Sequence, residues 1–242
     1  MSELDFSGRT VLVVGGSSGI GNGIAHGFLS RGAQVHVWGT RASADHYDAD
    51  DGSDLSGLRY SCVDVSDHAT IEAHQQDFDT LDVLVLSQGV VRYSQEEFEK
   101  PGWDYVMDVN IDSVMSCASK FKPLLAKNNG AIIIVSSISG MQANIGNPAY
   151  AASKAAAISL TKTLGQAWAR DGIRVNGLAP GLVPTKLTAV TTENEKRMQG
   201  ALRAIPMRRA GTPEDMAGVV LFLAFAAGRL CARADHCRRW RF

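Results

Sequence analysis

Tyr150 and Lys154 are the two residues whose types and spacing most clearly suggest chemistry. They stand four positions apart at the start of an alanine-rich run, Tyr150 to Ala169, and in a helix this spacing places both side chains on one face. A phenol beside a fixed ammonium group can donate and accept protons, because the positive charge lowers the pKa of the phenol. Bringing that pKa from about 10 to near 7 requires roughly 4 kcal/mol of preferential stabilisation of the phenolate. Such pairs also occur on ordinary solvated helices, so the rest of the chain must decide between the two interpretations.

Two further polar residues lie next to predicted buried elements. Ser137 follows the apolar run Ala131–Val135, which is typical of a buried strand. Its hydroxyl should emerge at the carboxyl edge of the sheet, where open α/β sheets present their ligands. Asn110 lies on or beside the apolar face of a long helix predicted after Pro101, and a buried Asn within a helix needs hydrogen-bond partners.

A glycine-rich turn near the N-terminus supplies the context for these residues. It separates the β-rich run Thr10–Val14 from a segment with apolar residues at helical spacing that ends at Gly32. Strand, glycine turn and helix in this order favour a nucleotide site, because backbone without Cβ atoms can approach a pyrophosphate and a helix N-terminus attracts negative charge. The alternative is a tight turn without a ligand. The candidate cofactor-binding residues here are Gly15, Ser17, Ser18, Gly19, Ile20 and Gly21.

The end of the second predicted strand bears on the choice of cofactor. In dinucleotide-binding folds an acidic residue at this point holds the adenosine ribose, but here Gln34–Trp38 is followed by Gly39, Thr40 and Arg41. The Thr40 hydroxyl and the Arg41 guanidinium can receive a 2'-phosphate, which a carboxylate would repel. The sequence therefore predicts a preference for NADP(H), with NAD(H) as the alternative. The simpler interpretation of Arg41 is a solvated loop arginine.

The remaining segments complete an alternation of strands and helices. Strands are predicted at 58–63, 81–86 and 173–178, and helices at 66–78, from 101 to at least 121, at 150–169 and at 212–224. Ser66 and Thr212 are the expected N-caps of two of these helices. Residues 42–57 are predicted to form a polar loop, and residues 185–204 to cover the site as a mostly polar lid. Six strand-helix alternations imply a parallel, doubly wound sheet.

Composition excludes several classes of function. The chain has 242 residues, 45% of them hydrophobic, and a net charge of -1. This balance suits one globular domain and gives no electrostatic reason to expect a nucleic acid or a membrane as a partner. The four cysteines show no zinc-like pairing and the six histidines form no spaced set, so no metal site is expected. The acidic N-terminus is unlike a signal peptide, and a cytoplasmic protein with reduced thiols is predicted.

In the order and spacing of its motifs the chain resembles the short-chain dehydrogenase/reductase family of the common single-domain type. It is similar in particular to β-ketoacyl-(acyl-carrier-protein) reductases and related ketone reductases. The resemblance covers about Asp5 to Leu223 and rests on Gly15-x-x-x-Gly19-Ile-Gly21, Asp64-Val65, Asn110, Ser137, Tyr150-x-x-x-Lys154 and Pro180-Gly181-x-x-x-Thr185. It implies a single Rossmann-like α/β domain over residues 1–223, with a doubly wound parallel sheet and helices on both faces.

The resemblance also implies roles for individual residues. Ser137 would hold a substrate carbonyl, Tyr150 would donate the proton in reduction, and Lys154 would lower the pKa of Tyr150 and hold the nicotinamide ribose. Asn110 would connect Lys154 to solvent through a water. Cofactor contacts are implied for Asp64 and Val65 near the adenine, for Ser87, Gln88 and Gly89 after the fourth strand, and for Pro180, Gly181, Val183 and Thr185 at the nicotinamide.

The sequence departs from the family pattern at two strand ends. Val14 stands where the family usually has Thr, and Leu86-Ser87-Gln88-Gly89 replaces the usual Asn-Asn-Ala-Gly. The missing Asn and Thr normally join these strand ends by hydrogen bonds. An apolar contact between Val14 and Leu86 is expected to take their place.

The C-terminal tail departs further. Residues 224–242 contain five arginines and two cysteines, and this composition does not predict the buried seventh strand that the family has here. We expect an atypical, disordered tail left by a change of coding frame near Leu223, with a divergent native tail as the alternative. Because the seventh strand often contributes to a tetramer contact in the family, a homo-oligomer (dimer or tetramer) weakened by this tail is expected.

Together these features predict an NADP(H)-dependent oxidoreductase that interconverts a ketone and a secondary alcohol. A mixed pocket for a modest organic carbonyl is expected from Val90, Val91, Met141, Leu182, Val183, Leu187, Val190 and Met198. The alternatives are a nucleotide-binding protein of the same fold without turnover and an NAD-dependent alcohol or sugar dehydrogenase. A nucleotide-sugar epimerase or dehydratase shares the Tyr-x-x-x-Lys pair, but it usually needs a larger C-terminal substrate domain.

Overall fold

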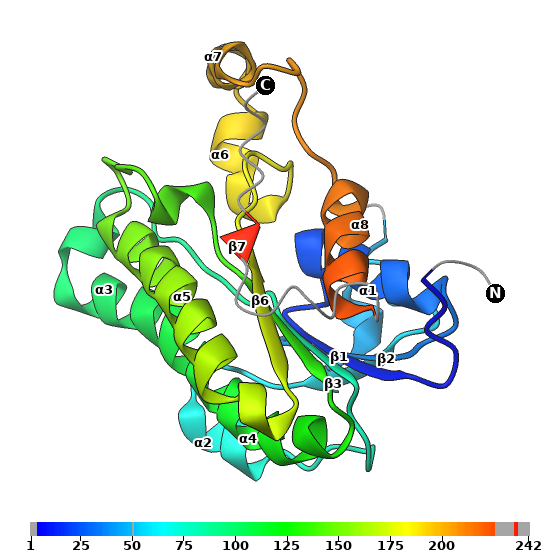
Figure 1. The fold of residues 1–242 in the computed structure, drawn as a ribbon. Coiled ribbons are helices and arrows are strands. Elements are labelled where there is room, and N and C mark those ends of the chain that lie inside the picture. Colours follow the sequence, from blue (N-terminus) through cyan, green and yellow to red (C-terminus); the bar gives the residue numbers. More distant parts are fainter. Residues whose placement is uncertain (1–3, 50, 226–234, 237–242) are drawn as a thin grey trace.

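A parallel sheet forms the centre of the fold. The computed structural model describes residues 4–49, 51–225 and 235–236, and this part of the chain forms a seven-stranded sheet in the order β3-β2-β1-β4-β5-β6-β7 (Figure 1). The strands are β1 (Thr10–Val14), β2 (Gln34–Gly39), β3 (Arg59–Cys62), β4 (Val83–Leu86), β5 (Ala131–Val135), β6 (Arg174–Leu178) and β7 (Asp235–His236). The strand order reverses between β1 and β4, which is the point where open α/β sheets bind ligands. The predicted doubly wound α/β fold is confirmed.

Helices cover both faces of the sheet (Figure 1). One face carries α1 (Gly19–Leu29) and α8 (Pro213–Ala224), and the other carries α2 (His68–Ala73), α4 (Ser113–Lys127) and α5 (Pro148–Ala167). α3 (Lys100–Met107) runs into α4 through a π-helical turn, η3 (Asp108–Asp112). The predicted lid contains α6 (Ala189–Thr192) and α7 (Glu195–Ala204), which lie beyond the carboxyl ends of the strands. Within the described residues, no helix has both the length and the apolar character needed to cross a bilayer.

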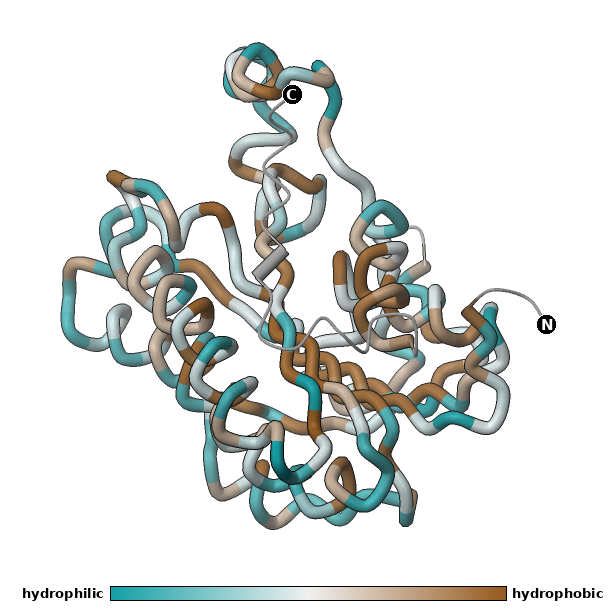
Figure 2. Tube along the Cα trace, in the orientation of Figure 1, coloured by the Kyte–Doolittle hydropathy of each residue, from teal (hydrophilic) through white to brown (hydrophobic). Residues whose placement is uncertain are grey.

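Successive side chains along a strand point to opposite faces of the sheet, so the hydrophobic core consists of two clusters, one on each face. Val11 and Val13 belong to the hydrophobic cluster of α1 and α8, whereas Leu12 and Val14 belong to the cluster of α4 and α5. All five residues of β1 are buried, as a central parallel strand with helices on both faces requires. Figure 2 shows the most hydrophobic colouring concentrated along the strands.

α1 and α8 approach each other closely because α1 presents glycines to α8. A Cβ atom at Gly23 would lie 2.3 Å from the Cβ of Pro213, and one at Gly27 would lie 3.0 Å from the Cβ of Ala217. Thr212 caps α8 as predicted and forms a capping box with Asp215. α8 is therefore fixed against the helix that follows the glycine-rich turn.

Two of the predicted helices have different boundaries in the structure. The N-cap of α2 is Asp67, whose carboxylate accepts the N–H of Ala69 at 2.9 Å, while the Ser66 hydroxyl donates to Asp64 at 2.7 Å. The cap therefore lies one residue later than the predicted Ser66, and the helix also ends at Ala73, before the predicted residue 78. α5 begins at Pro148, because a proline is accommodated in the first turn of a helix, where its missing N–H is not needed.

Of the tail, residues 224–242, the structure describes Ala224 and Phe225 at the end of α8 and, beyond them, Asp235 and His236. Asp235 and His236 form β7, which pairs in parallel with Gly177 and Leu178 of β6. The expectation that the tail has no seventh strand is therefore wrong at these two positions. Residues 226–234 and 237–242, on which the rest of that prediction falls, lie outside the described residues.

Candidate active site

A cleft of about 310 Å³ opens at the carboxyl ends of the central strands. Tyr150 and Lys154 line it together with the glycine-rich turn, so the two ends of the predicted site are brought together. The predicted residues that line the cleft are Gly15, Ser17, Ser18, Gly19, Ile20, Gly21, Thr40, Val65, Ser87, Gln88, Gly89, Ser137, Tyr150, Lys154, Pro180, Gly181, Val183 and Thr185. Asn110, Arg41 and Asp64 are not among the lining residues.

The glycine-rich turn leaves an open helix N-terminus at the cleft. Gly15 has φ +74°, and a Cβ there would lie 2.8 Å from the backbone of Gln88, so only glycine suits this position. α1 begins without a side-chain cap and without an acidic residue in its first turn. Because Ser18, Gly19 and Ile20 line the cleft, the positive end of the helix dipole faces it. This arrangement fits a pyrophosphate group.

Ser137 and Tyr150 are held against each other by a close approach of two elements. Ser137 follows β5 and precedes the short turn η4 (Ile138–Gly140). This turn lies directly on α5, because a Cβ at Gly140 would be only 2.6 Å from the Lys154 carbonyl carbon. Burial raises the pKa of Tyr150, and a hydrogen bond from Ser137 opposes that rise. Tyr150 is therefore a protonated donor paired with a second hydroxyl.

Lys154 is a buried cation one helical turn from Tyr150. Its side chain is 4% exposed, and Nζ donates to the Val135 carbonyl at 3.1 Å and lies 5.8 Å from the centroid of the Tyr150 ring. Burial lowers the pKa of Lys154 to about 8. The last carbonyl of β5 thus fixes the amine beside the phenol, as the spacing of the two residues predicts.

Asn110 lies behind the cleft and joins two of its walls. Its Oδ1 accepts the Val90 N–H at 2.8 Å, and its Nδ2 donates to the Val90 carbonyl at 2.9 Å and to the Ser153 hydroxyl at 3.1 Å. Ser153 in turn donates to the Tyr150 carbonyl at 2.9 Å. Asn110 stands in the π-helical turn η3, and such turns are frequent at functional sites. It holds the segment after β4 onto the helix that carries Tyr150.

Glu97 is a residue that sequence reasoning missed. It lies in the short turn η2 (Glu96–Phe98) and is completely buried. Its carboxylate accepts the N–H of Tyr150 at 2.8 Å, the N–H of Arg92 at 2.9 Å and the Asn147 amide at 3.3 Å. The N–H of Tyr150 belongs to the first turn of α5, which has no partner within the helix. Glu97 therefore accepts a hydrogen bond from a backbone N–H that would otherwise be unpaired at the start of the helix that carries Tyr150 and Lys154.

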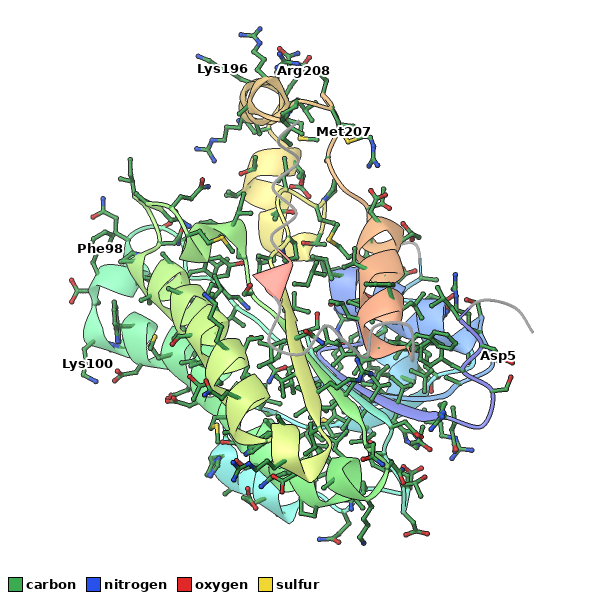
Figure 3. The ribbon with its side chains drawn as sticks, in the orientation of Figure 1. Asp5, Phe98, Lys100, Lys196, Met207 and Arg208 are labelled. Atoms are coloured by element: carbon green, nitrogen blue, oxygen red, sulfur yellow. The ribbon has the colours of Figure 1, made fainter. Side chains whose placement is uncertain are left out.

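The lid leaves and rejoins the body of the protein at one place. The Gly211 N–H donates to the Leu182 carbonyl at 2.9 Å, which closes the base of the intervening segment. Tyr93, from the segment after β4, donates its hydroxyl to the Leu187 carbonyl at 2.8 Å and so connects the lid to the opposite wall. The outer end of the segment between Leu182 and Gly211 carries Lys196 on the lid, with Met207 and Arg208 just after it (Figure 3).

Some lining residues were not predicted as part of the site. Trp38, Gly39, Val63, Val109, Val135 and Ser136 lie at the ends of strands or in η3, and Lys186 and Thr188 lie on the lid. The apolar ones could have been found from their place at the carboxyl ends of predicted strands. Of the residues expected to form an apolar substrate pocket, Val90, Val183 and Leu187 line the cleft, whereas Met141 and Val190 are exposed.

Comparison with known proteins identifies the family. A family model described as enoyl-(acyl carrier protein) reductase matches residues 14–232. The chain is 37% identical over 229 residues to a 3-oxoacyl-(acyl-carrier-protein) reductase of Chlamydia muridarum, covering 89% of this chain and 90% of that protein. The chain belongs to the short-chain dehydrogenase/reductase family. The relatives that it matches are named dehydrogenases and reductases, and the chain is an oxidoreductase that acts on CH–OH donors with NAD(P).

Other members of the short-chain dehydrogenase/reductase family match along most of their length. A 2-dehydro-3-deoxy-D-gluconate 5-dehydrogenase of Pseudoalteromonas atlantica is 34% identical over 235 residues, covering 93% of this chain and 91% of that protein. Among solved structures, the Pseudomonas aeruginosa RhlG/NADP active-site complex has a TM-score of 0.85 and 30% identity, covering 96% and 95% of the two chains. A putative 2-deoxy-D-gluconate 3-dehydrogenase from Agrobacterium tumefaciens with bound NADP has a TM-score of 0.86 and 31% identity, covering 99% of both.

The departures from the usual short-chain dehydrogenase/reductase motifs are accommodated by packing. Val14 and Leu86 are register partners in neighbouring strands, both are fully buried, and the Ser87 N–H donates to the Val14 carbonyl at 3.0 Å. The expected apolar pairing is therefore confirmed. Gln88 is buried and donates to the Ser113 hydroxyl at 3.0 Å, while its Oε1 is buried and has no hydrogen-bond partner among the described residues.

Proposed function

We propose that this protein transfers hydride between NADP(H) and a small organic carbonyl or secondary alcohol, with Tyr150 as the general acid and base. The observation that carries the proposal is the meeting of Ser137, Tyr150 and Lys154 with the glycine-rich turn in one cleft. A site for hydride transfer needs these two parts together, because the carbonyl must lie between the proton donor and the reactive end of the cofactor.

The cleft offers a place for each part of the cofactor. The N-terminus of α1, with Gly15, Gly19 and Gly21, would hold the pyrophosphate, and Val65 would lie beside the adenine. Lys154 would hold the nicotinamide ribose, and the segment from Pro180 to Thr185 would hold the nicotinamide. When bound, the nicotinamide supplies the hydride in reduction and accepts it in oxidation.

The proposed roles of the catalytic residues follow from their protonation and contacts. Tyr150 is buried and protonated, so its hydroxyl can donate to a carbonyl oxygen as negative charge develops there. Ser137, hydrogen-bonded to Tyr150, would hold the same oxygen. The charged Lys154 would favour the phenolate that forms when Tyr150 loses its proton.

Asn110 is proposed to serve the return of that proton. It would bind a water that connects Lys154 to solvent. In support, a Cβ atom built on Gly89 would lie 3.3 Å from the Lys154 amine and 3.7 Å from Asn110 Oδ1. Only a residue without a side chain leaves the space between these two groups open.

NADP(H) is proposed as the preferred cofactor. The end of β2 carries Thr40 and Arg41 and no carboxylate, and a carboxylate there would repel a 2'-phosphate. The titles of two of the similar structures name NADP as bound. The names of the relatives suggest two substrate chemistries to test, a 3-oxoacyl thioester and a keto sugar acid.

The test combines cofactor titration with a carbonyl screen. NADPH should bind more tightly than NADH, and at least one of the two carbonyl classes should be reduced. Tyr150→Phe should bind NADPH as the unchanged protein does but should not oxidise it in the presence of substrate. Turnover by Tyr150→Phe at the original rate would overturn the assigned mechanism, and tighter binding of NADH would overturn the choice of cofactor.

We also propose that the protein is cytoplasmic and forms a homo-oligomer. Exposed apolar side chains on η2, α3 and α4 support association, namely Phe98 at 61% exposure, Trp103 at 37% and Met115 at 38% (Figure 3 labels Phe98). Light scattering on the purified chain tests the proposal, which a monomer at micromolar concentration would contradict.

A further inference from the structure

Tyr47 occupies a set of hydrogen-bond donors at the adenosine end of the cleft. Its phenol oxygen accepts the backbone N–H groups of Thr40 and Arg41, each at 3.1 Å, and the Ser17 hydroxyl is hydrogen-bonded to the same oxygen. Ser17 and Thr40 line the cleft. Gly39 leaves room for the arrangement, since a Cβ there would lie 2.5 Å from both the Ser17 and the Tyr47 oxygens.

The donors around the Tyr47 oxygen suit an anion. Two successive backbone N–H groups and a hydroxyl converge on one point, which is how protein backbone binds phosphate oxygens. Burial alone would raise the pKa of Tyr47, but its hydrogen bonds with Ser17, Tyr60 and the two backbone N–H groups outweigh burial and lower that pKa. The surroundings therefore stabilise negative charge on an oxygen at this position more than water does.

Arg41, which the sequence assigns to a 2'-phosphate, is engaged with the same segment. Its guanidinium lies 4.7 Å from the centroid of the Tyr47 ring and donates to the His46 carbonyl. Its own carbonyl accepts the Tyr60 hydroxyl. Of the two predicted phosphate ligands, the Thr40 hydroxyl and the Arg41 guanidinium, the guanidinium is thus engaged by Tyr47 and His46. At Thr40 it is the backbone N–H that Tyr47 occupies.

We propose that Tyr47 is a specificity-determining residue, which competes with the 2'-phosphate of NADP(H) for Ser17 and the N–H groups of Thr40 and Arg41. The inference rests on the proposed function, since it assumes that the cleft binds a dinucleotide. A 2'-phosphate must displace the Tyr47 oxygen before it gains these donors and the released Arg41. The 2'-hydroxyl of NAD(H) is smaller and uncharged and does not need to displace Tyr47. The Tyr47 oxygen therefore reduces the affinity for NADP(H) relative to NAD(H), compared with a site in which the same donors are unoccupied.

Displacement of Tyr47 is structurally undemanding. The residue follows the short turn η1 (Ala44–His46) in an irregular, polar segment whose neighbouring residues His46 and Asp48 are exposed. Tyr47 is only partly buried and belongs to neither hydrophobic cluster. Its ring can leave without opening the core.

The experiment measures the binding of two cofactor fragments by calorimetry. Adenosine 2',5'-bisphosphate carries the 2'-phosphate, and 5'-AMP lacks it. Tyr47→Phe removes the competing oxygen and keeps the ring beneath Arg41. We expect it to bind the bisphosphate about tenfold more tightly, the equivalent of one or two hydrogen bonds that no longer have to be broken, and to bind 5'-AMP as before.

Tyr60→Phe is the matched control. It removes the other phenol oxygen of the pair, which lies 3.4 Å from the Tyr47 oxygen and donates to the Arg41 carbonyl. The Tyr47 oxygen still occupies the N–H groups in this variant, so any gain in affinity for the bisphosphate should be much smaller than in Tyr47→Phe. Equal or weaker bisphosphate binding by Tyr47→Phe than by the unchanged protein would overturn the inference. An equal gain in bisphosphate affinity in Tyr60→Phe would also overturn it, because general loosening of this segment would then explain the gain in both variants. Failure of all three proteins to bind either fragment would instead overturn the proposed function, and the inference with it.

Discussion

Glu97→Gln tests whether a carboxylate outside the cleft positions Tyr150. Glu97 is completely buried and accepts hydrogen bonds from Arg92, Asn147 and Tyr150. Glutamine has the same shape, but one of its two terminal atoms is a donor that would face an N–H group. A charge-assisted hydrogen bond contributes about 1.5–3 kcal/mol, and a buried donor left without a partner costs about 1–3 kcal/mol. We expect the free energy of unfolding to fall by about 3 kcal/mol.

The same substitution has an electrostatic consequence at Tyr150. Burial raises the pKa of Tyr150, the hydrogen bond from Ser137 opposes it, and the negative charge of Glu97 adds to the rise. Removing that charge should lower the pKa of Tyr150. The pH above which ketone reduction loses its proton donor should therefore move downward, a shift that altered packing alone gives no reason to expect.

Two measurements check these expectations. Thermal unfolding should show a midpoint lower by about 6–12 °C for a protein of this size, and the pH profile of kcat/KM for reduction should shift to lower pH. Glu96→Gln is the control, because Glu96 is the exposed neighbour in the same turn and loses the same charge. Unchanged stability of Glu97→Gln, or a profile displaced toward higher pH, would refute the reasoning.

Three further predictions concern buried groups. Burial lowers the pKa of Lys154 from 10.5 to about 8, so the folded state holds this proton less tightly than the unfolded chain. Below pH 8 the charge therefore costs the folded state up to about 3 kcal/mol. Lys154→Met should be inactive, yet its free energy of unfolding in urea at pH 7 should exceed that of the unchanged protein. The difference in free energy of unfolding should shrink between pH 8 and 10.5, where the folded protein loses the Lys154 proton and the unfolded chain keeps it. A lower free energy of unfolding at pH 7 would contradict this. Burial also lowers the pKa of His36 below 6.5, against the opposing charge of Asp77, so the unfolded chain takes up this proton first. The free energy of unfolding should fall as the pH drops below 6.5, by at most about 1.4 kcal/mol per pH unit, and an equally steep fall in His36→Leu would exclude His36 as the cause. Gly21→Ala should abolish cofactor binding and lower the melting temperature, because its Cβ would lie 2.1 Å from the Gly15 carbonyl oxygen. Gly218→Ala, whose Cβ would meet nothing within 4 Å in α8, should instead stabilise the protein by about 0.5–1 kcal/mol, and similar melting temperatures for the two variants would contradict the argument.

Features that depend on neighbouring residues could be predicted from the sequence. The glycine-rich turn, the Tyr150 and Lys154 pair and the Thr212 cap each use chemistry that lies within a few positions of the chain. Their place in the fold then followed from the rule that parallel strands present their carboxyl ends at one edge. The meeting of the turn and the pair in one cleft was therefore predictable before any coordinates were known.

Features that depend on distant partners could not be predicted. Glu97 resembles any other charge in an acidic stretch, and only its contact with Tyr150, 53 positions away, shows its role. Tyr47 lies in a polar segment that gave no pattern at all. The π-helical turn at Asn110 has no sequence period of its own. β7 pairs with β6 over two residues, so its pairing, and not a hydrophobic alternation, defines it.

The hydrogen bond between Gly211 and Leu182 has a consequence for how this enzyme can diversify. The segment between them departs from the body and returns to it at one point, and the helix after it is locked onto α1 through Gly23 and Pro213. The first residues of the excursion, Val183 and residues 185–188, line the cleft and stay tied to the cofactor site. Its outer part, α6 and α7, can vary in length and composition without changing those residues, so a transplanted α6–α7 segment from a relative is the natural way to alter substrate range while preserving coenzyme affinity.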